Sequence, residues 1–274
     1  MIGQHRSTQR RERITASDEP QLLAEILELS KANPRYGYRR IHRLLLRAGW
    51  RINRKRVQRL WRREGLRVPR KSKKRRRLGD SSQSCIRRRA ERPNHVWSYD
   101  FVFDRTEDGR QIKMLALVDE YTRECLCLHA SRSITSSDVL GLLAGVMIER
   151  GAPEYLRSDN GPEFIAHAVK AWLNSVGTST LFVEPGAPWE NGYIESFNSR
   201  LRDELLNGEI FVSLAEARYM LERFAKVYNT ERPHSSLKYR TPSEAAPCSA
   251  PSDSASLRLQ APCTATPAAV AQNP

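Results

Sequence analysis

The sequence predicts an α/β core with a mixed five-stranded sheet and flanking helices, preceded by a small all-α domain. Two observations predict this fold class. Residues 19–64 contain three runs with apolar side chains at helical spacing. Residues 95–183 alternate aromatic and β-branched runs with helical ones, in the order strand, strand, strand, helix, strand, helix, strand, which is typical of a mixed sheet.

Three helices are expected in the small domain. The first runs from Glu19 to Ala32, the second from Tyr38 to Arg47, and the third from Arg54 to Glu64 with Asn53 as its N-cap. A helix, a short turn that contains Gly49 and a basic helix form the helix-turn-helix pattern. The alternative is a solvated basic face on an ordinary helical hairpin.

Charge is distributed unevenly along the 274 residues, whose net charge is +15. Residues 1–92 hold 29 basic and 8 acidic side chains, a net of +21, whereas residues 93–274 hold 17 basic and 23 acidic ones, a net of −6. Double-stranded DNA is the expected partner of the basic part, because Lys and Arg neutralise phosphates. An anionic membrane surface is the alternative, and no lipidation motif or basic amphipathic helix with a bulky aromatic side favours it.

The chain is expected to divide into a basic arm (1–18), a helix-turn-helix domain (19–68), a basic linker (69–92), a catalytic core (93–245) and a disordered tail (246–274). No apolar run approaches ~18 residues and the N-terminus lacks the apolar run of a signal peptide, so a cytoplasmic, nucleoid-associated protein without a membrane span is expected. A nuclear localisation role is the alternative for the linker's basic run. The predicted DNA contacts in these regions are Arg39, Arg40, Arg54, Lys55, Arg56, Arg59, Lys73, Lys74, Arg75 and Arg76.

The core begins with three strands that short turns join into an antiparallel meander. Ser136 or Ser137 is expected to cap a helix that runs to Arg150. The five cysteines contain no CxxC pair, so neither a disulfide framework nor a zinc site is indicated. The expected strands are 95–104, 113–118, 124–129, one that ends at Ser158, and 179–183, and the remaining helices are 164–175, about 190–206 and 214–228.

Three carboxylates stand out in this core. Asp100 lies among bulky apolar residues of the first strand, where a carboxylate is costly unless it is paired, hydrogen-bonded or bound to metal. Asp159 follows the fourth strand, and sites in α/β sheets gather at the carboxyl ends of strands. Glu195 shares a helix face with Asn191, Asn198 and Arg202, so it can point across the strand ends.

Three such carboxylates suit a pair of Mg²⁺ ions, which prefer hard oxygen ligands and serve phosphodiester chemistry. Each acid also has a separate structural interpretation: Asp100 as a salt-bridge partner, Asp159 as a turn residue within Asp-Asn-Gly, and Glu195 as a solvated helix residue. Asp119 more simply closes a strand–turn, with Arg123 as a partner. The competing candidate ligands are Asp104, Asp119 and Glu163.

Over about residues 1–245 the sequence resembles the OrfB subunit of the two-reading-frame insertion-sequence transposases, which have a retroviral-integrase-type core. The resemblance is carried by RYGYRRIHRLLLRAGWRINRKRVQRLWRREGLRV, WSYDFVFD, LRSDNGPEF, PWENGYIESFNSRLRDELL and YNTERPHSSLKYRTPSEA. The interval of 35 residues between Asp159 and Glu195 is typical of that family. The resemblance implies a ribonuclease H-like fold in which Asp100, Asp159 and Glu195 are the catalytic metal ligands.

The resemblance further implies a DNA transposase that uses Mg²⁺, with Mn²⁺ as a substitute, to nick element ends and then to join the exposed 3′-OH to another phosphodiester. Asn160, Asn191 and Arg202 are then expected near the scissile phosphate. Such enzymes work as multimers on paired ends with an OrfA partner product, often as a frameshift fusion. Two alternatives are a nuclease that cuts without joining and a DNA-binding regulator with an inactive core. Arg232 and His234 are candidates for DNA contact or for a structural role.

Overall fold

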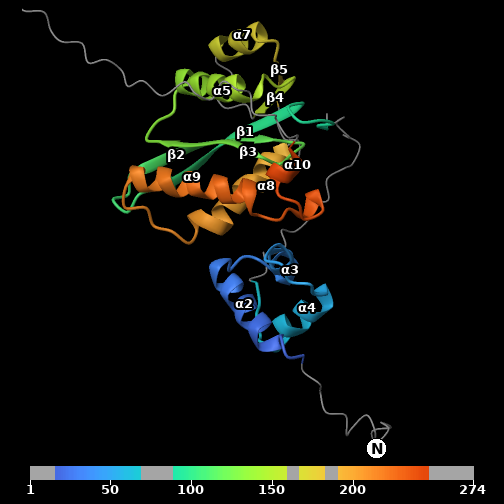
Figure 1. The fold of residues 1–274 in the computed structure, drawn as a ribbon. Coiled ribbons are helices and arrows are strands. Elements are labelled where there is room, and N and C mark those ends of the chain that lie inside the picture. Colours follow the sequence, from blue (N-terminus) through green and yellow to red (C-terminus); the bar gives the residue numbers. More distant parts are fainter. Residues whose placement is uncertain (1–15, 69–88, 159–166, 183–190, 247–274) are drawn as a thin grey trace, which may run out of the picture.

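The computed structural model describes residues 16–68, 89–158, 167–182 and 191–246, which form a three-helix domain and a layered α/β core (Figure 1). Most of the predicted arm, linker and tail lie outside these ranges, so those domain boundaries stay predictions. None of the described helices is long and apolar enough to cross a membrane.

The three-helix domain confirms the predicted helices almost residue for residue. Its elements are α2 (Glu19–Ala32), α3 (Tyr38–Arg47) and α4 (Arg54–Arg63). Asn53 caps α4 as predicted, since its side chain accepts a hydrogen bond of 2.9 Å from the backbone N–H of Lys55. One face of each helix is buried in a shared core made of Leu22, Ile26, Ile41, Leu45, Val57, Leu60 and Trp61.

The core sheet has five strands in the order β3-β2-β1-β4-β5, which confirms the predicted mixed sheet. The strands β1 (Val96–Arg105), β2 (Gln111–Asp119) and β3 (Cys125–Ser131) form the expected antiparallel meander. The strands β4 (Tyr155–Ser158) and β5 (Ser179–Phe182) add on in parallel, beginning beside β1. The first strand therefore lies at the centre of the sheet.

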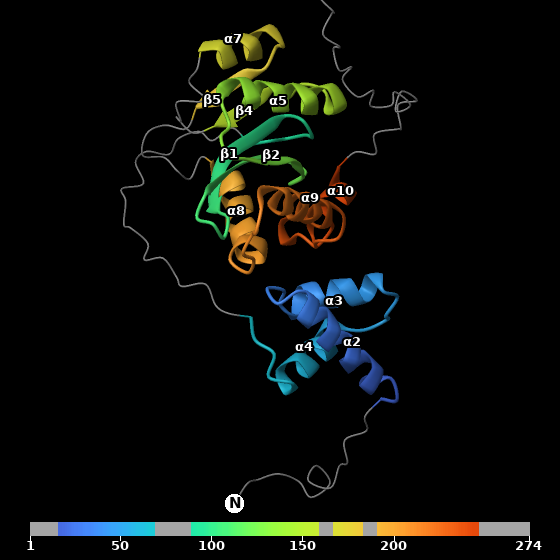
Figure 2. The ribbon, with the colours of Figure 1, turned by 90° about the vertical axis from the view of Figure 1, so that its left-hand side faces the viewer.

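Helices cover both faces of the sheet (Figure 2). On one side lie α5 (Ser136–Arg150) and α7 (His167–Ser175), whose apolar residues pack with Trp97, Leu117 and Leu156 of the sheet. On the other side lie α8 (Gly192–Leu201) and α9 (Leu214–Thr230), packed against the alternate residues of β1 and β2 such as Val102 and Met114. The alternation of side chains along a strand thus supplies two separate hydrophobic layers.

The cap of α5 differs from the prediction. Thr135, not Ser136 or Ser137, is the N-cap, and its hydroxyl accepts a hydrogen bond from the backbone N–H of Asp138. The Asp138 carboxylate in turn accepts one from the backbone N–H of Thr135, which completes a capping box. Thr135 has extended backbone angles, whereas Ser136 is already helical, so the helix begins one residue earlier than a cap at Ser136 would allow.

The helix that carries Glu195 does not continue as a regular α-helix. After Leu201 it becomes a π-helical turn, Arg202–Leu206, in which the N–H of Asn207 donates to the carbonyl of Arg202 at 2.8 Å. The chain after α9 has a short 3₁₀ turn, η3 (Ser235–Leu237), and a last helix, α10 (Pro242–Ala245). π-Helical turns are rare and often accompany functional sites.

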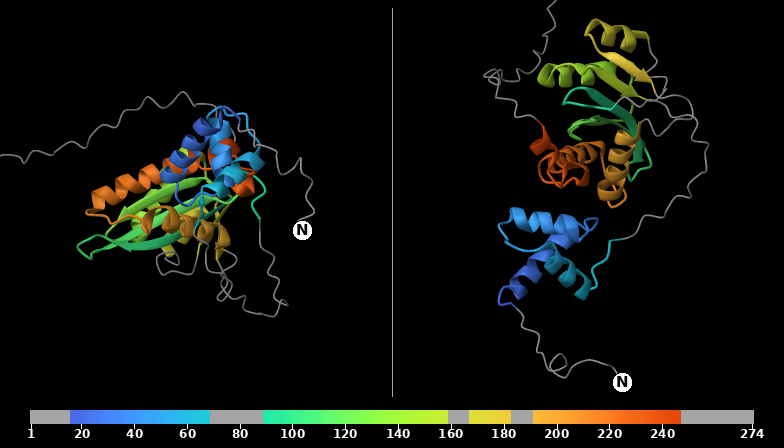
Figure 3. Two further views of the ribbon diagram at one scale, coloured as in Figure 1. Left: turned by 90° about the horizontal axis from the view of Figure 1, so that it is seen from below. Right: turned by 90° about the vertical axis from the view of Figure 1, so that its right-hand side faces the viewer.

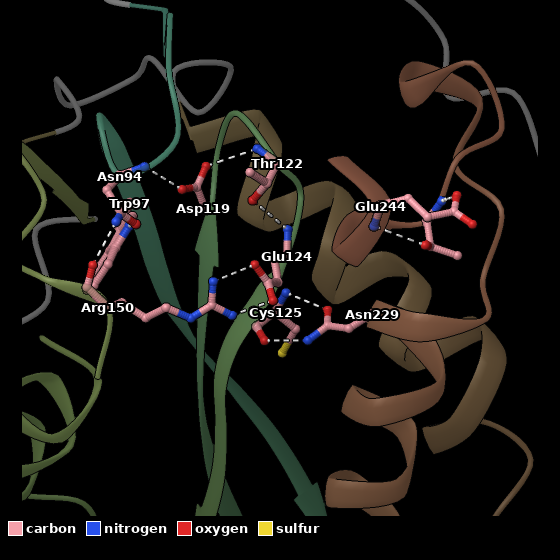
Figure 4. A network of polar contacts seen from close by, with 10 residues as sticks. Asn94, Trp97, Asp119, Thr122, Glu124, Cys125, Arg150, Asn229 and Glu244 are labelled. Atoms are coloured by element: carbon pink, nitrogen blue, oxygen red, sulfur yellow. Dashed lines mark hydrogen bonds and ion pairs between the residues drawn. The ribbon is translucent and has the colours of Figure 1, made fainter. Parts of the chain in front are cut away.

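Polar contacts hold the turn between β2 and β3 in place (Figure 4). Asp119 closes this turn as predicted, because its carboxylate accepts hydrogen bonds from the backbone N–H groups of Asn94, Tyr121 and Thr122. The predicted pairing of Asp119 with Arg123 is made through the backbone, since the N–H of Arg123 donates to the carbonyl of Asp119 at 2.9 Å. The described residues show no ion pair between the two side chains, and the guanidinium of Arg123 lies 3.6 Å from the ring centroid of Tyr193, at the start of α8. Burial of Asp119 raises the pKa of its carboxyl, against the effect of those hydrogen bonds.

The helix-turn-helix domain packs against the side of the core that carries α8, α9 and α10 (Figure 3). Among the described residues three ion pairs span the contact, and each joins a basic residue of the small domain to an acidic residue of the core. The basic half predicted from the sequence thus meets the acidic half, as opposite charges favour. The pairs are Arg35 with Asp203, Arg40 with Glu204 at 3.5 Å, and Arg47 with Glu244 at 2.8 Å.

Candidate active site

The candidate site lies where α8 crosses the central strand β1. Asp100 sits in the middle of β1, opposite Ala116 of β2, and is half-buried. Its Oδ1 accepts a hydrogen bond of 2.8 Å from the backbone N–H of Phe101. Its Oδ2 accepts one of 2.8 Å from the side-chain amide of Asn198 on α8. A strand and a helix that are nearly 100 residues apart in sequence therefore hold this carboxylate together.

Glu195 reaches the same place from α8. The apolar face of this helix, Ile194, Phe197 and Leu201, is buried in the core. That packing turns Glu195 outward, where it is exposed to solvent. Asp100 and Glu195 line one open cavity of about 660 Å³, together with Asn198, Ser199 and Arg202 among others.

Two side-chain amides beside this cavity have an oxygen that the described residues do not satisfy. Asn198 uses its N–H₂ group on Asp100, and its Oδ1 is buried without a hydrogen-bond partner. Asn191 occupies the N-cap position of α8 and is buried, yet its side chain makes no capping bond and its Oδ1 also lacks a partner among these residues. Buried polar atoms of this kind favour a site that takes a further polar group.

Arg202 brings a positive charge to the same cavity. Its side chain is exposed, and its Nη2 donates to the carbonyl oxygen of Phe103 on β1 at 3.2 Å. Of the competing acids, Asp119 is engaged in its turn, whereas Asp104 lies four residues beyond Asp100 and accepts from the backbone N–H of Arg105.

The third predicted carboxylate, Asp159, lies outside the described residues, as do Asn160 and Glu163. The described chain stops at Ser158, the last residue of β4, and β4 pairs directly with β1. Arg157, one residue earlier, forms a buried ion pair with Glu120 at 3.1 Å, which ties β4 to the turn after β2. Within the described ranges no three His, Cys, Asp or Glu side chains gather at one point.

The two carboxylates present have the chemistry that a divalent cation of the Mg²⁺ type requires. Both are oxygen ligands, they come from different elements, and they line one open cavity where water and phosphate can also enter. The hydrogen bonds from Asn198 and from the backbone of Phe101 hold Asp100 in one orientation, as supporting contacts do for metal ligands. The residues present therefore fit such an ion.

The structure divides the predicted DNA contacts of the small domain into two groups. Arg56 pairs with Asp18, and Arg59 pairs with Glu19 at 3.0 Å, so acidic residues at the start of α2 partly neutralise the basic face of α4. Arg40 is half-buried against the core, and burial lowers its pKa. Exposed positions are held by Arg39 on α3 and by Arg54 and Lys55 in the first turn of α4. Lys73, Lys74, Arg75 and Arg76 lie outside the described residues.

Arg232 and His234 have structural contacts. Arg232 is 2% exposed and holds Glu204 with two hydrogen bonds, 2.7 Å from Nε and 2.5 Å from Nη2. Its Nη1 lies 3.2 Å from Nε2 of His234, and His234 packs edge-on against the ring of Tyr228. Burial, reinforced by Arg232, lowers the pKa of His234 to about 2, so this imidazole is neutral and accepts the hydrogen bond from Arg232.

Comparison with known proteins places this geometry in a family. Two integrase core domain profiles match residues 90–188 and 176–242, and an HTH-like domain profile matches residues 17–74. The insertion element IS407 uncharacterized 31.7 kDa protein of Burkholderia multivorans is 37% identical over 223 residues, which cover 81% of this chain and 79% of that protein. The chain belongs to the insertion-sequence transposase family.

Other relatives of this transposase-family chain agree. The insertion element IS476 uncharacterized 39.2 kDa protein of Xanthomonas euvesicatoria is 38% identical over 215 residues; the match covers 78% of this chain and 61% of that protein, so the chain spans about three fifths of this relative. Among solved structures, a simian T-cell lymphotropic virus intasome in complex with PP2A regulatory subunit B56 gamma matches with a TM-score of 0.51 at 18% identity, covering 68% of this chain and 63% of that chain. This likeness supports the integrase-type, ribonuclease H-like fold.

Sequence reasoning did not assign a role to Asn198. It lies three residues after Glu195, a spacing that puts both side chains on neighbouring positions of one helix face. The signal was therefore present in the sequence. Only the crossing of α8 over β1 shows that its partner is Asp100.

Proposed function

We propose that this chain is a DNA transposase that cleaves DNA at insertion-sequence ends and joins the exposed 3′-OH to a second phosphodiester. The observation that carries the proposal is the convergence of Asp100 and Glu195 on one open cavity in a chain of the transposase family. The two carboxylates come from a central strand and from a helix that crosses it. Asp159 is proposed as the third member of the set, because it follows β4, the neighbour of β1, directly in the chain.

The residues of this site are proposed to hold divalent metal, with Mg²⁺ as the expected ion and Mn²⁺ as a substitute. Asp100, Glu195 and Asp159 would be its ligands, and Asn198 orients Asp100 toward it. When bound, such ions polarise the phosphodiester and activate the attacking oxygen of water or of a DNA 3′-OH.

DNA is the proposed substrate, and several positive side chains are placed to hold it. Arg202 lies in the candidate cavity itself, where a scissile phosphate brings negative charge. Arg39, Arg54 and Lys55 present exposed charge on the helix-turn-helix domain and position the duplex through its backbone. Asn160, Asn191 and the four basic linker residues Lys73, Lys74, Arg75 and Arg76 complete the proposed DNA contacts.

Further partners are proposed from the family. An OrfA product is expected to supply additional end recognition, either as a separate chain or as a frameshift fusion. The active form is expected to be a multimer on paired element ends, in the cytoplasm and associated with the nucleoid. Domain boundaries at 18, 68, 92 and 245 are proposed with it.

The test is a strand-transfer assay with the full chain, a labelled duplex that carries the element end, and Mg²⁺ or Mn²⁺. The OrfA product is both included and omitted. The variants are Asp159→Asn and Glu195→Gln, and Glu222→Gln serves as the matched control because Glu222 is an exposed glutamate on α9, outside the candidate cavity. Removal of a ligand is expected to lower joined product by more than about 100-fold, because loss of a supporting contact alone costs ~10–100-fold.

Each outcome selects one of the functions that remain. Joined products that depend on metal and are lost in both variants, while duplex binding is kept, support the transposase. Cleavage without joining supports a nuclease instead. Binding without any cleavage, even with the OrfA product and the correct end, supports a DNA-binding regulator and returns Asp159 to a turn residue.

A further inference from the structure

A second cavity, of about 260 Å³, lies on the other side of the N-terminal half of α8. It shares Gly192 and Ser196 with the candidate active site, and its other walls come from further residues of α8 and from other elements. The turn after β2, the helix-turn-helix domain and the chain after α9 all contribute to it. Four arginines line it: Arg40, Arg123, Arg200 and Arg232.

The positive charge in this second cavity exceeds the negative charge that faces it. Glu204 is the carboxylate paired with this group; it binds Arg232 through two hydrogen bonds and Arg40 at 3.5 Å. Among the described residues Arg123 and Arg200 have no carboxylate within ion-pair distance. Within the described part of the chain, one carboxylate thus pairs with two of these four guanidinium groups, and positive charge is in excess.

Arg123 is the least satisfied of the four. Its Nε and Nη1 atoms are buried and lack a hydrogen-bond partner in the described part of the chain. Its guanidinium stacks on the ring of Tyr193 at 3.6 Å, so the plane of the group is fixed although its donors are unused. Buried donors without partners are costly, and more so when they are charged. A group that is held in place but not satisfied suits an anionic ligand that supplies the acceptors.

The neutral donors around the second cavity fit the same kind of ligand. Ser196, Ser235 and Ser236 line it with hydroxyl groups, and all three serines are exposed. His234 also lines it as a neutral group. No carboxylate lines this cavity among the residues described, so an incoming anion meets donors and no fixed negative charge.

We infer that the second cavity binds a backbone phosphate of the DNA substrate, at a position away from the phosphate that reacts. This inference rests on the proposed function, since it takes DNA as the substrate. The cavity suits a phosphate because guanidinium groups bind phosphate oxygens through charge-assisted hydrogen bonds, and Arg123 has two donors, Nε and Nη1, without a partner among the described residues.

The proposed phosphate site and the candidate active site lie on two sides of the same helix, α8. One side of this helix lines the second cavity with residues at helical spacing, Tyr193, Ser196 and Arg200. The other side lines the candidate active site with Glu195, Asn198 and Arg202. One helix thus separates the reacting phosphate from the held one. Because Arg40 belongs to α3, a strand bound here also contacts the helix-turn-helix domain, and the second cavity is complete only when that domain is docked.

The first experiment measures thermal unfolding of the full chain against inorganic phosphate at constant ionic strength. The variants are Arg123→Asn and Arg200→Gln, and Asn is chosen because residue 123 has φ +64°, which asparagine tolerates well. Phosphate also stabilises proteins non-specifically, so Arg105→Gln, an exposed arginine at the end of β1, defines that background. The wild type and the control are expected to show a larger rise in melting temperature than the two cavity variants.

The second experiment measures binding of a labelled duplex over a range of salt concentrations. Loss of one phosphate contact is expected to lower the slope of log Kobs against log salt by ~0.9 for each cavity variant and to leave the control unchanged. Equal phosphate effects and equal slopes in all variants would overturn the inference. A lost phosphate effect with an unchanged DNA slope would mean that the cavity binds a free anion, which overturns the assignment to DNA.

The two proposals fail separately in these tests. If the cavity variants lose both effects but the wild type joins no DNA, the phosphate site stands and the transposase function falls. If the wild type joins DNA while the cavity variants match the control in both measurements, the transposase function stands and the phosphate site falls.

Discussion

The buried pair of Arg232 and Glu204 gives a sharp test of how the core is held together. The perturbation is Arg232→Met, which keeps an unbranched side chain of similar length and removes the charge. At 2.7 Å the attraction between the two groups is about 6 kcal/mol for an effective dielectric constant of about 20. Breaking a buried pair by removing one partner typically costs about 3–5 kcal/mol. Because Glu204 keeps Arg40 at 3.5 Å, the lower end, about 3 kcal/mol, is expected.

Urea denaturation, followed by tryptophan fluorescence, measures this loss in the free energy of unfolding. Arg240→Met is the matched control, because Arg240 is an exposed arginine in the same segment, and it should change stability by less than about 0.5 kcal/mol. Glu204→Gln combined with Arg232→Met should cost less than the sum of the two single changes, because the second change removes a charge that the first left buried. A loss below about 1 kcal/mol for Arg232→Met, the range of a surface pair, would refute the reasoning.

Three further outcomes are expected. Asn198→Ala should lower metal-dependent activity by ~10–100-fold, with a raised Mg²⁺ requirement in a metal titration and an unchanged unfolding midpoint, because Asp100 loses its orienting amide. Burial lowers the pKa of His234 from 6.5 to about 2. The stability that the neutral imidazole contributes is therefore complete above pH 6.5, and below it the free energy of unfolding falls by about 1.4 kcal/mol per pH unit until the pH reaches the pKa of the folded state. His234→Gln should flatten that part of the profile of stability against pH. Thr135→Ala should cost about 1 kcal/mol in urea denaturation through loss of the capping box, whereas Ser137→Ala should cost almost nothing.

Much of the fold was predictable because local pattern decides it. The helices of the small domain and the meander of the core follow from apolar spacing and from strand-forming runs, and the cap at Asn53 follows from local side-chain chemistry. The N-cap of α5 was predicted at the wrong residue because local sequence did not decide it. Thr135, Ser136 and Ser137 are all acceptable caps, and the choice depends on which one has its partner Asp138 three residues later.

The site was predictable only in part, because its contacts join distant residues. Helical spacing indicated that Glu195 and Asn198 share a face, but the contact of Asn198 with Asp100 depends on how α8 crosses β1. The side-chain contact of Arg123 has the same origin. Arg123 donates to Asp119, four residues away in sequence, only through its backbone N–H, whereas its guanidinium lies on Tyr193, 70 positions further along. The place of Asp159 beside these residues stays a prediction.

The π-helical turn Arg202–Leu206 has a consequence for the length of this segment. An α-helix turns by about 100° per residue, so deleting one residue here would rotate everything after it by about that angle. Asp203 and Glu204 would then face away from Arg35 and Arg40, while Glu195 kept its place upstream. The π-helical turn thus sets the relative orientation of Glu195, which faces the candidate cavity, and of Asp203 and Glu204, which bind the small domain. The protein should therefore tolerate an insertion or deletion in this turn less well than a side-chain substitution.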